Sequence, residues 1–214
     1  MLIPESRLIT CVFLIILCLN LAFGQTTTSQ EYYQDGRLKA EGKVSDQGKE
    51  GIWKFYYPNG KINSIEEYRN DMLHGEVRYY DFDSNLIGEE NWEQGLLEDS
   101  AHYYYASGSV EKLGVYENGL YEGEWRFFYE DGQLKRVGNY RQGLPHGDWT
   151  FYHENGQLWQ TGSFADGKET GDWKFYTSEG KLEYTGQFEE GERVGEWYYY
   201  TARGKKKKMK NPDR

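Results

Sequence analysis

The residues that could bind a metal or perform acid–base chemistry are few in this chain and widely scattered. The histidines do not form a cluster that could supply the ligands of a zinc site: His74, His102, His146 and His153. Residues 81–85 carry the acidic and amide side chains that begin a calcium-binding loop. Leu86 and Trp92, however, stand where that loop requires glycine and glutamate. We therefore expect no metal and no cofactor.

Carboxylates are abundant, but they recur at fixed positions and do not form a single acid–base pair. The sequence has no phosphate-binding loop, dinucleotide-binding fingerprint or nucleophile elbow. One acidic series is spaced by multiples of 24 residues: Glu76, Glu124, Asp148, Asp172 and Glu196. A residue that returns in most units of a repeat is a surface or turn feature, so we expect no enzymatic activity.

This acidic series belongs to a repeat that covers nearly the whole chain. Glycines and aromatic residues return every 24 residues without insertion or deletion, giving about seven and a half units over residues 31–202. Four glycine columns hold 23 of the 26 glycines, so glycine here serves the architecture. The tryptophan column is Trp53, Trp125, Trp149, Trp173 and Trp197, with Val77 and Ala101 in the two missing positions.

One unit of the repeat predicts a β-hairpin. Residues 124–129 alternate aromatic and polar side chains, which is typical of a strand, and residues 130–133 contain the Asp-Gly pair of a tight turn. Residues 134–140 form the return strand, with Leu134 expected on the face of Arg136. Residues 143–147 are expected to be a glycine-bounded loop. The predicted fold is therefore all-β: one elongated antiparallel sheet of stacked hairpins.

A glycine in the middle of the return strand has a packing explanation. Gly138 and its equivalents lack a side chain on the face that carries the tryptophans. An indole can lie over that bare backbone. We therefore predict that these glycines lie beneath aromatic rings.

The composition excludes several other classes of protein. The mean hydropathy of −0.90 argues against a membrane protein with several spans. Aromatic residues make up 17% of the chain, far more than disordered chains contain. The shortage of alanine and leucine argues against a helical bundle.

The N-terminal segment predicts export. Residues 1–24 have the features of a secretory signal peptide: Arg7, an apolar stretch over residues 8–21, and small residues before a cleavage site near Gly24. Retention as a membrane anchor is the alternative. Both cysteines lie in this segment, so the exported chain would contain no disulfide. A short linker, residues 25–30, precedes the repeats.

Residues 147–167 show a family resemblance most clearly. They contain the pattern Gly-x-Trp-x-Phe-Tyr-x-x-Asn-Gly-x-Leu, followed by Gly-x-Phe-x-x-Gly. This pattern resembles the MORN repeat in its bacterial variant form, and the match covers nearly all of residues 31–204. Proteins of this kind are often grouped as the YwqK-like antitoxin family. That grouping implies a non-enzymatic inhibitor of a toxin partner.

The repeat is least regular over residues 76–105. Val77 and Ala101 replace tryptophan here, and acidic residues replace glycine. One interpretation is a partner-binding patch, in which exposed aromatic anchors lie beside carboxylates that select a basic partner. Its candidate residues are Trp92, Tyr103, Tyr104, Tyr105, Glu89 and Glu90. The alternative is drift in a tolerant repeat, or a bend in the sheet.

The charge is divided between the repeats and a basic tail. Residues 203–214 carry a net charge of +6, whereas residues 25–202 carry −16. The tail could bind an anionic membrane surface through Lys205, Lys206, Lys207, Lys208 and Lys210. It could equally be a solvated last half-repeat that folds back on the acidic sheet. The acidic repeats are not expected to bind nucleic acid.

These features lead to one main hypothesis for function and two alternatives. The main hypothesis is an exported, non-enzymatic repeat scaffold that binds a protein partner. The alternatives are an antitoxin or immunity-type inhibitor, and a module that binds glycans or membrane surfaces. The open ends of the sheet are expected either to be capped or to pair between chains.

Overall fold

The computed structural model describes residues 25–210 of the 214-residue chain. The predicted signal peptide and the last four residues of the basic tail lie outside the described residues. Within residues 25–210 there is no helix, and every regular element is a strand. The strands are β1 (Thr27–Tyr32), β2 (Leu38–Ser45), β3 (Gly48–Tyr56), β4 (Ile62–Arg69), β5 (Met72–Tyr80), β6 (Leu86–Glu93), β7 (Leu96–Leu97), β8 (Asp99–Tyr104), β9 (Val110–Glu117), β10 (Leu120–Phe128), β11 (Leu134–Arg141), β12 (Leu144–Tyr152), β13 (Leu158–Ala165), β14 (Lys168–Tyr176), β15 (Leu182–Glu189), β16 (Glu192–Tyr200) and β17 (Lys206–Lys208).

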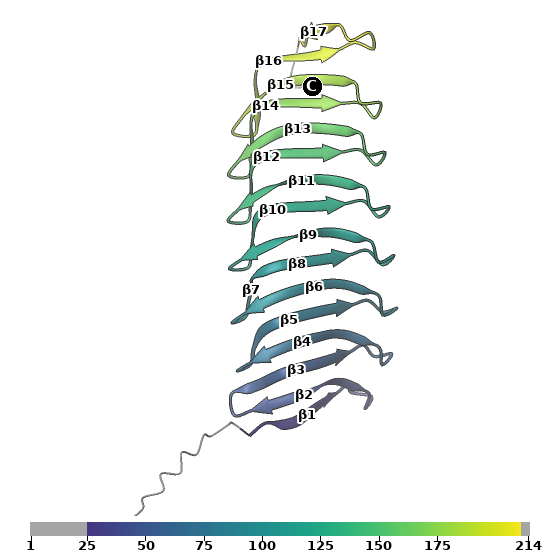
Figure 1. Ribbon diagram of the computed structural model, residues 1–214, viewed down its shortest axis with the longest axis vertical. Coiled ribbons are helices and arrows are strands. Elements are labelled where there is room, and N and C mark those ends of the chain that lie inside the picture. The colour runs from purple at the N-terminus through teal and green to yellow at the C-terminus, as the bar shows by residue number, and fades with distance from the viewer. Residues whose placement is uncertain (1–24, 211–214) are drawn as a thin grey trace, which may run out of the picture.

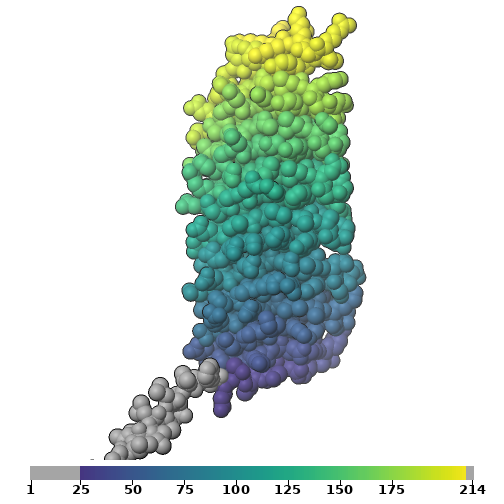
Figure 2. Space-filling view, viewed as in Figure 1, coloured from purple at the N-terminus to yellow at the C-terminus, as the bar shows by residue number. Residues whose placement is uncertain are grey.

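The strands form one open antiparallel sheet in which each strand other than β7 pairs with the next along the chain (Figure 1). At the irregular unit, β6 pairs with both β7 and β8. The chain therefore rises steadily from the N-terminal to the C-terminal end of a long stack (Figure 2). The predicted all-β class and the single elongated sheet of stacked hairpins are confirmed.

The prediction of a loop between successive hairpins is wrong. Residues 144–147 belong to β12, and the chain reverses in a two-residue turn at Gln142 and Gly143. Both residues have positive φ, 51° and 80°, as a type I′ hairpin turn requires. Each unit is therefore two strands with a tight turn at either end, and the 24-residue period is the length of that circuit.

A β-bulge changes the direction of the side chains that follow the Asp-Gly turn at residues 130–133. In the pairing of β10 with β11, Phe127 lies opposite Arg136 while Phe128 lies opposite Leu134, so Lys135 has no partner of its own. A residue inserted in this way breaks the alternation of faces. Leu134 consequently does not share the face of Arg136, contrary to the sequence-based expectation.

The tryptophan column defines what we call the aromatic face of the sheet; the other side is the opposite face. The column is at most 3% exposed although the sheet has a single layer. Each indole lies on the glycine 11 residues before it. A Cβ atom added to that glycine would lie within 2.4 Å of the ring, at Gly42, Gly114, Gly138, Gly162 and Gly186. The prediction that these glycines lie beneath aromatic rings is confirmed.

Neighbouring rings hold the indoles of the tryptophan column in place, and four of the five also donate a hydrogen bond to a backbone carbonyl oxygen. Trp149 stacks on Phe151 at 5.6 Å and meets the edge of Phe164 at 5.6 Å. Its indole N–H donates to the carbonyl oxygen of Asn139 at 3.1 Å. The stack is also linked at its turns, where the Tyr129 hydroxyl donates to the carbonyl oxygen of Tyr152 in the next unit.

The close contact between indole and backbone predicts a steric effect of substitution. We expect Gly138→Ala to lower the free energy of unfolding by about 1–3 kcal/mol, because the new methyl group would overlap the Trp149 ring. Gly88→Ala is the matched control, since its Cβ would meet the Tyr103 ring at an ordinary 3.4 Å. Urea unfolding measures both variants. Equal stabilities for the two variants would show that the contact between Gly138 and the Trp149 ring is not sterically restrictive.

Candidate functional site

Two units lack the tryptophan and its glycine together. Glu66 takes the glycine position beside Val77, and Glu90 takes it in the unit where Ala101 replaces tryptophan. Val77 and Ala101 are fully buried. Because neither carries an indole, the space above the preceding strand is open to a side chain. Loss of the indole makes room for the glutamate side chain, so the two changes in each unit are sterically compatible. Together they place two carboxylates among the aromatic rings.

A second column on the aromatic face carries cations in the two units that follow those of Glu66 and Glu90. Lys112 and Arg136 lie on β9 and β11, each directly opposite Phe127 of β10. In the neighbouring units this column holds Ser64, Gly88, Gln160 and Tyr184. We call Glu66, Glu90, Lys112 and Arg136 the polar track. It occupies four consecutive units, with the carboxylates first and the cations after them.

Glu90 is the most buried member of the polar track, with an exposed fraction of 8%. Its carboxylate accepts hydrogen bonds from the Trp92 indole N–H at 3.0 Å and the Tyr103 hydroxyl at 2.5 Å. The Tyr103 hydroxyl also lies 3.0 Å from that of Tyr116. The charge is therefore held by donors within the sheet itself, as a buried carboxylate requires.

Glu66 is held in a similar way one unit earlier. The Ser64 hydroxyl donates to one carboxylate oxygen at 2.6 Å, and the Tyr68 hydroxyl donates to the other at 2.6 Å. Ser64 is itself buried. Ser64 and Tyr68 lie on the same strand as Glu66, two residues to either side.

The tyrosines around these carboxylates hold their protons strongly. Burial raises the pKa of Tyr103 far above its ordinary value, and its hydrogen bonds to Glu90 and Tyr116 raise the pKa further. Burial and the bond to Glu66 raise the pKa of Tyr68 in the same direction. These phenols remain hydrogen-bond donors throughout the physiological range of pH.

The cations lie over aromatic rings. The Lys112 Nζ atom is 4.1 Å from the centre of the Tyr103 ring and donates to the Tyr121 hydroxyl at 2.8 Å. The Arg136 guanidinium carbon is 4.0 Å from the centre of the Phe127 ring. Such placement stabilises a cation through the electron-rich ring face.

The structure divides the predicted partner-binding residues among three places. Glu90, Trp92 and Tyr103 meet on the aromatic face. Glu89 and Tyr104 pair separately, with the Tyr104 hydroxyl donating to Glu89 at 2.7 Å. Burial and that bond raise the pKa of Tyr104 to about 12. The Tyr105 hydroxyl donates to the carbonyl oxygen of Phe128 in the next unit.

The expectation of exposed aromatic anchors in this patch is wrong. Tyr103, Tyr104 and Tyr105 are all half-buried, and their hydroxyl groups have partners within the chain. Sequence reasoning also missed Glu66, Lys112 and Arg136. The signal was available, because Glu66 lies 24 residues before Glu90 and Lys112 lies 24 before Arg136.

The basic tail begins as a strand. Lys206–Lys208 form β17, which pairs with β16 and places Lys208 in an ion pair with Glu196 at 2.5 Å. The Lys206 Nζ atom is 3.7 Å from the centre of the Tyr198 ring. Lys205, Lys207 and Lys210 are exposed. Part of the tail therefore folds onto the acidic sheet and covers the edge of β16.

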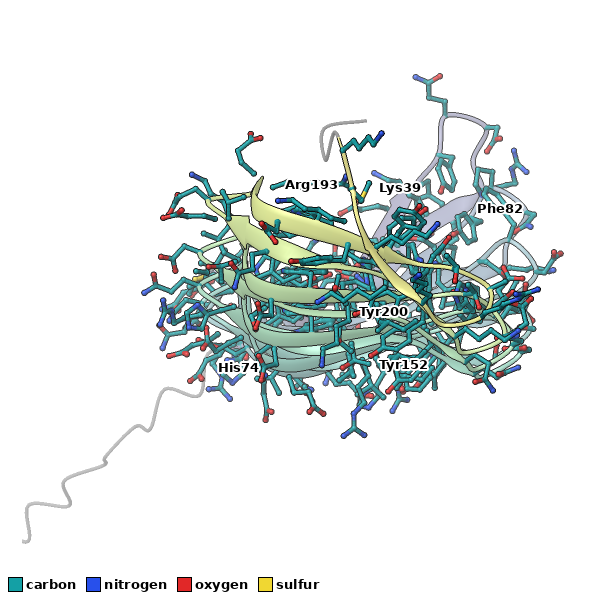
Figure 3. The ribbon with its side chains drawn as sticks, turned by 90° about the horizontal axis from the view of Figure 1, so that it is seen from above. Lys39, His74, Phe82, Tyr152, Arg193 and Tyr200 are labelled. Carbon is teal, nitrogen blue, oxygen red and sulfur yellow. The ribbon has the colours of Figure 1, made fainter. Side chains whose placement is uncertain are left out.

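Side chains project from both faces of the sheet, with Arg193 and His74 on opposite sides of the stack (Figure 3). The Asp81 carboxylate lies in a hairpin turn, where it accepts hydrogen bonds from the backbone N–H groups of Asp83 and Asn85.

Within residues 25–210, no three histidine or acidic side chains are grouped so that they could hold a metal ion. The same residues contain no helix long and apolar enough to cross a membrane.

Comparison with protein families agrees with this architecture. The family described as MORN repeat variant matches residues 49–70, 121–142, 145–166 and 169–190. The four matches support a MORN-repeat protein. They omit residues 71–120, which contain Glu90, Lys112 and the whole irregular stretch, residues 76–105. A comparison with curated protein sequences found no match.

Solved structures share only a low level of similarity with this chain. The GtfA/B complex bound to UDP and GlcNAc is 15% identical, with 52% of this chain and 22% of that chain covered and a TM-score of 0.24. The TcdB2-TccC3-Cdc42 structure is 12% identical, with 82% and 13% covered and a TM-score of 0.20. A porin-like protein from Bacteroides uniformis is 8% identical, with 88% and 94% covered and a TM-score of 0.21. The chain spans about a fifth of the first structure's length, and none of the three bears on its function.

The buried hydrogen bond of Glu90 predicts two effects of Tyr103→Phe. At pH 7 we expect the free energy of unfolding to fall by about 1–3 kcal/mol, because a buried carboxylate loses a donor. The raised pKa keeps Tyr103 protonated in the folded chain, whereas tyrosines of the unfolded chain ionise near pH 10. The wild-type chain should therefore lose stability as the pH rises through 10, and the variant should lose it less steeply.

Urea unfolding between pH 7 and pH 11 measures both effects. The control is Tyr32→Phe, which removes the hydroxyl of an exposed tyrosine and should change stability at pH 7 by less than about 0.5 kcal/mol. If Tyr103→Phe were as stable as the wild type at pH 7, the hydrogen bond to Glu90 would contribute nothing to the free energy of unfolding.

Proposed function

We propose that the chain is an exported, non-catalytic scaffold that binds another protein along its aromatic face. The polar track carries this proposal. Elsewhere on the face, the glycine and tryptophan columns pack bare backbone against rings, which gives the repeat its stability. Replacing that packing with charged groups has a cost, and such local departures from a fold's own rules mark functional sites. A repeat scaffold presents these groups in a fixed linear order, as an extended binding surface needs.

Two further features support the proposal. The sequence pattern of residues 1–24 supports export, and residues 25–214 contain no cysteine that an oxidising compartment could pair wrongly. MORN repeats are generally associated with scaffolding and interaction and not with catalysis, which agrees with the match to that family.

An antitoxin-type inhibitor would be a special case of the same binding function. It predicts one tight partner in a one-to-one complex, whereas a scaffold predicts several partners. Measurement of the mass of the complex distinguishes the two.

The basic end of the sheet supports an additional contact with an anionic membrane surface. Lys205, Lys207 and Lys210 are exposed beside β17, where they could meet anionic headgroups. Glycan binding has less support, because the tryptophan column is buried. Among the described residues, Trp159 is the one exposed tryptophan, at 44%.

Affinity capture from the exported fraction tests the proposed function. The bait is the chain from residue 25 onward, and Glu66→Gln/Glu90→Gln is the variant of the aromatic face. Glu124→Gln/Asp172→Gln is the matched control on the opposite face. We expect a partner that the wild-type chain and the control retain and that the aromatic-face variant loses. Recovery of no specific protein, or equal recovery by all three baits, would contradict the proposal.

A further inference from the structure

A hollow of about 330 Å³ opens on the aromatic face beside Phe127, at the cationic end of the polar track. Its walls include the rings of Tyr121, Phe127 and Tyr140 and the cationic side chains of Lys112, Lys135 and Arg136. This volume lies in the range of small-ligand sites. The mixture of ring faces and cations is unexpected in a repeat domain whose net charge is −16.

Arg136 has a hydrogen-bond donor that the described chain leaves unused. Its Nε atom is buried, and no described residue accepts a hydrogen bond from it. The guanidinium group rests on the Phe127 ring at 4.0 Å, so its position is fixed by packing. A buried donor without a partner costs stability, and it is accounted for if a ligand supplies the acceptor.

The fold brings two further cations to the same hollow. The bulge opposite Phe127 leaves Lys135 unpaired beside Arg136, so both side chains line the hollow. Lys112 enters from the other neighbouring strand, and its Nζ atom is held by the Tyr121 hydroxyl. Strands β9 and β11 therefore place positive charges on either side of the Phe127 ring.

We infer that this hollow binds a carboxylate that is attached to an apolar or aromatic group, contributed by the protein partner. An arginine N–H edge matches the geometry of a carboxylate, and such charge-assisted hydrogen bonds are among the stronger ones. The rings of Tyr121 and Tyr140 offer an apolar surface for the group that carries the acid. The inference rests on the proposed function and names the chemistry of its anchor.

The hollow favours a ligand with one negative charge over a ligand with two. Glu111 lines it together with the three cations, and its carboxylate would repel a phosphate dianion more than a carboxylate monoanion. On the same face, Glu66 and Glu90 precede the cations, so a partner lying along the polar track meets negative charge first and positive charge second. The acid of the partner is thereby directed to the β9–β11 end.

Binding of a small probe tests the inference without the partner. The probe is N-acetyl-phenylalanine, which joins a carboxylate to a ring, and N-acetyl-phenylalaninamide is its uncharged control. We expect only the acid to shift the Arg136 Nε–H resonance of the ¹⁵N-labelled chain, as purified from cells. We also expect Arg136→Gln to weaken binding of the acid about tenfold or more, through loss of a charge-assisted hydrogen bond. Arg136→Lys should weaken it too, because the fork of donors is lost.

Arg126→Gln is the matched control, since Arg126 is also on a central strand but forms an ion pair with Glu124. Thermal unfolding of each variant shows whether the fold is retained, and Arg136→Lys keeps the test valid if Arg136→Gln does not fold. Equal binding of acid and amide, or tighter binding of inorganic phosphate than of the acid, would overturn the inference. If a partner is captured equally by wild type and Arg136→Lys, the inference fails while the scaffold function stands. If the acid binds but no partner is captured, the scaffold function fails while the site stands.

Discussion

The contact between a tryptophan ring and the bare backbone of a glycine one strand away supports the whole sheet. An indole can lie this close only where no Cβ exists, and the added atom at Gly138 would lie 2.1 Å from the Trp149 ring. The contact buries the largest apolar side chain without a second layer of structure. It explains how a chain with a mean hydropathy of −0.90 folds, and how it does so from residue 25 onward without disulfides.

The same contact explains where function can be accommodated. A side chain can occupy the glycine position only if the indole is removed, so the two columns must change together. Glu66 with Val77 and Glu90 with Ala101 are such paired changes. The carboxylates are then held by hydrogen bonds from tyrosine hydroxyls, a serine hydroxyl and the Trp92 indole N–H, all within the sheet. The cations Lys112 and Arg136 continue the track where the tryptophans resume.

Much of the fold could be predicted from the sequence because its period is strict. The strands, the hairpin turns and the glycines beneath rings all follow from which residues return every 24 positions. The connection at Gly143 was predicted as a loop because two-residue type I′ turns bounded by glycine look like loops in sequence. The orientation of Lys135 and Arg136 depends on a bulge, and a bulge changes register without changing the period. The breaks in the repeat pattern point to Glu90, Trp92 and Tyr103 as candidate partner-binding residues, which stays a prediction, and they give no sign of the hollow beside Phe127.

We propose that the units lacking tryptophan have lost the contact between indole and glycine and carry partner-binding groups in its place. Restoring the repeat at both places tests it directly, in a chain that carries Glu66→Gly, Val77→Trp, Glu90→Gly and Ala101→Trp. The measurement is the dissociation constant for the captured partner, with the melting temperature recorded beside it. We expect a melting temperature at or above that of the wild type and a loss of partner binding. Full binding in the restored chain would contradict this proposal.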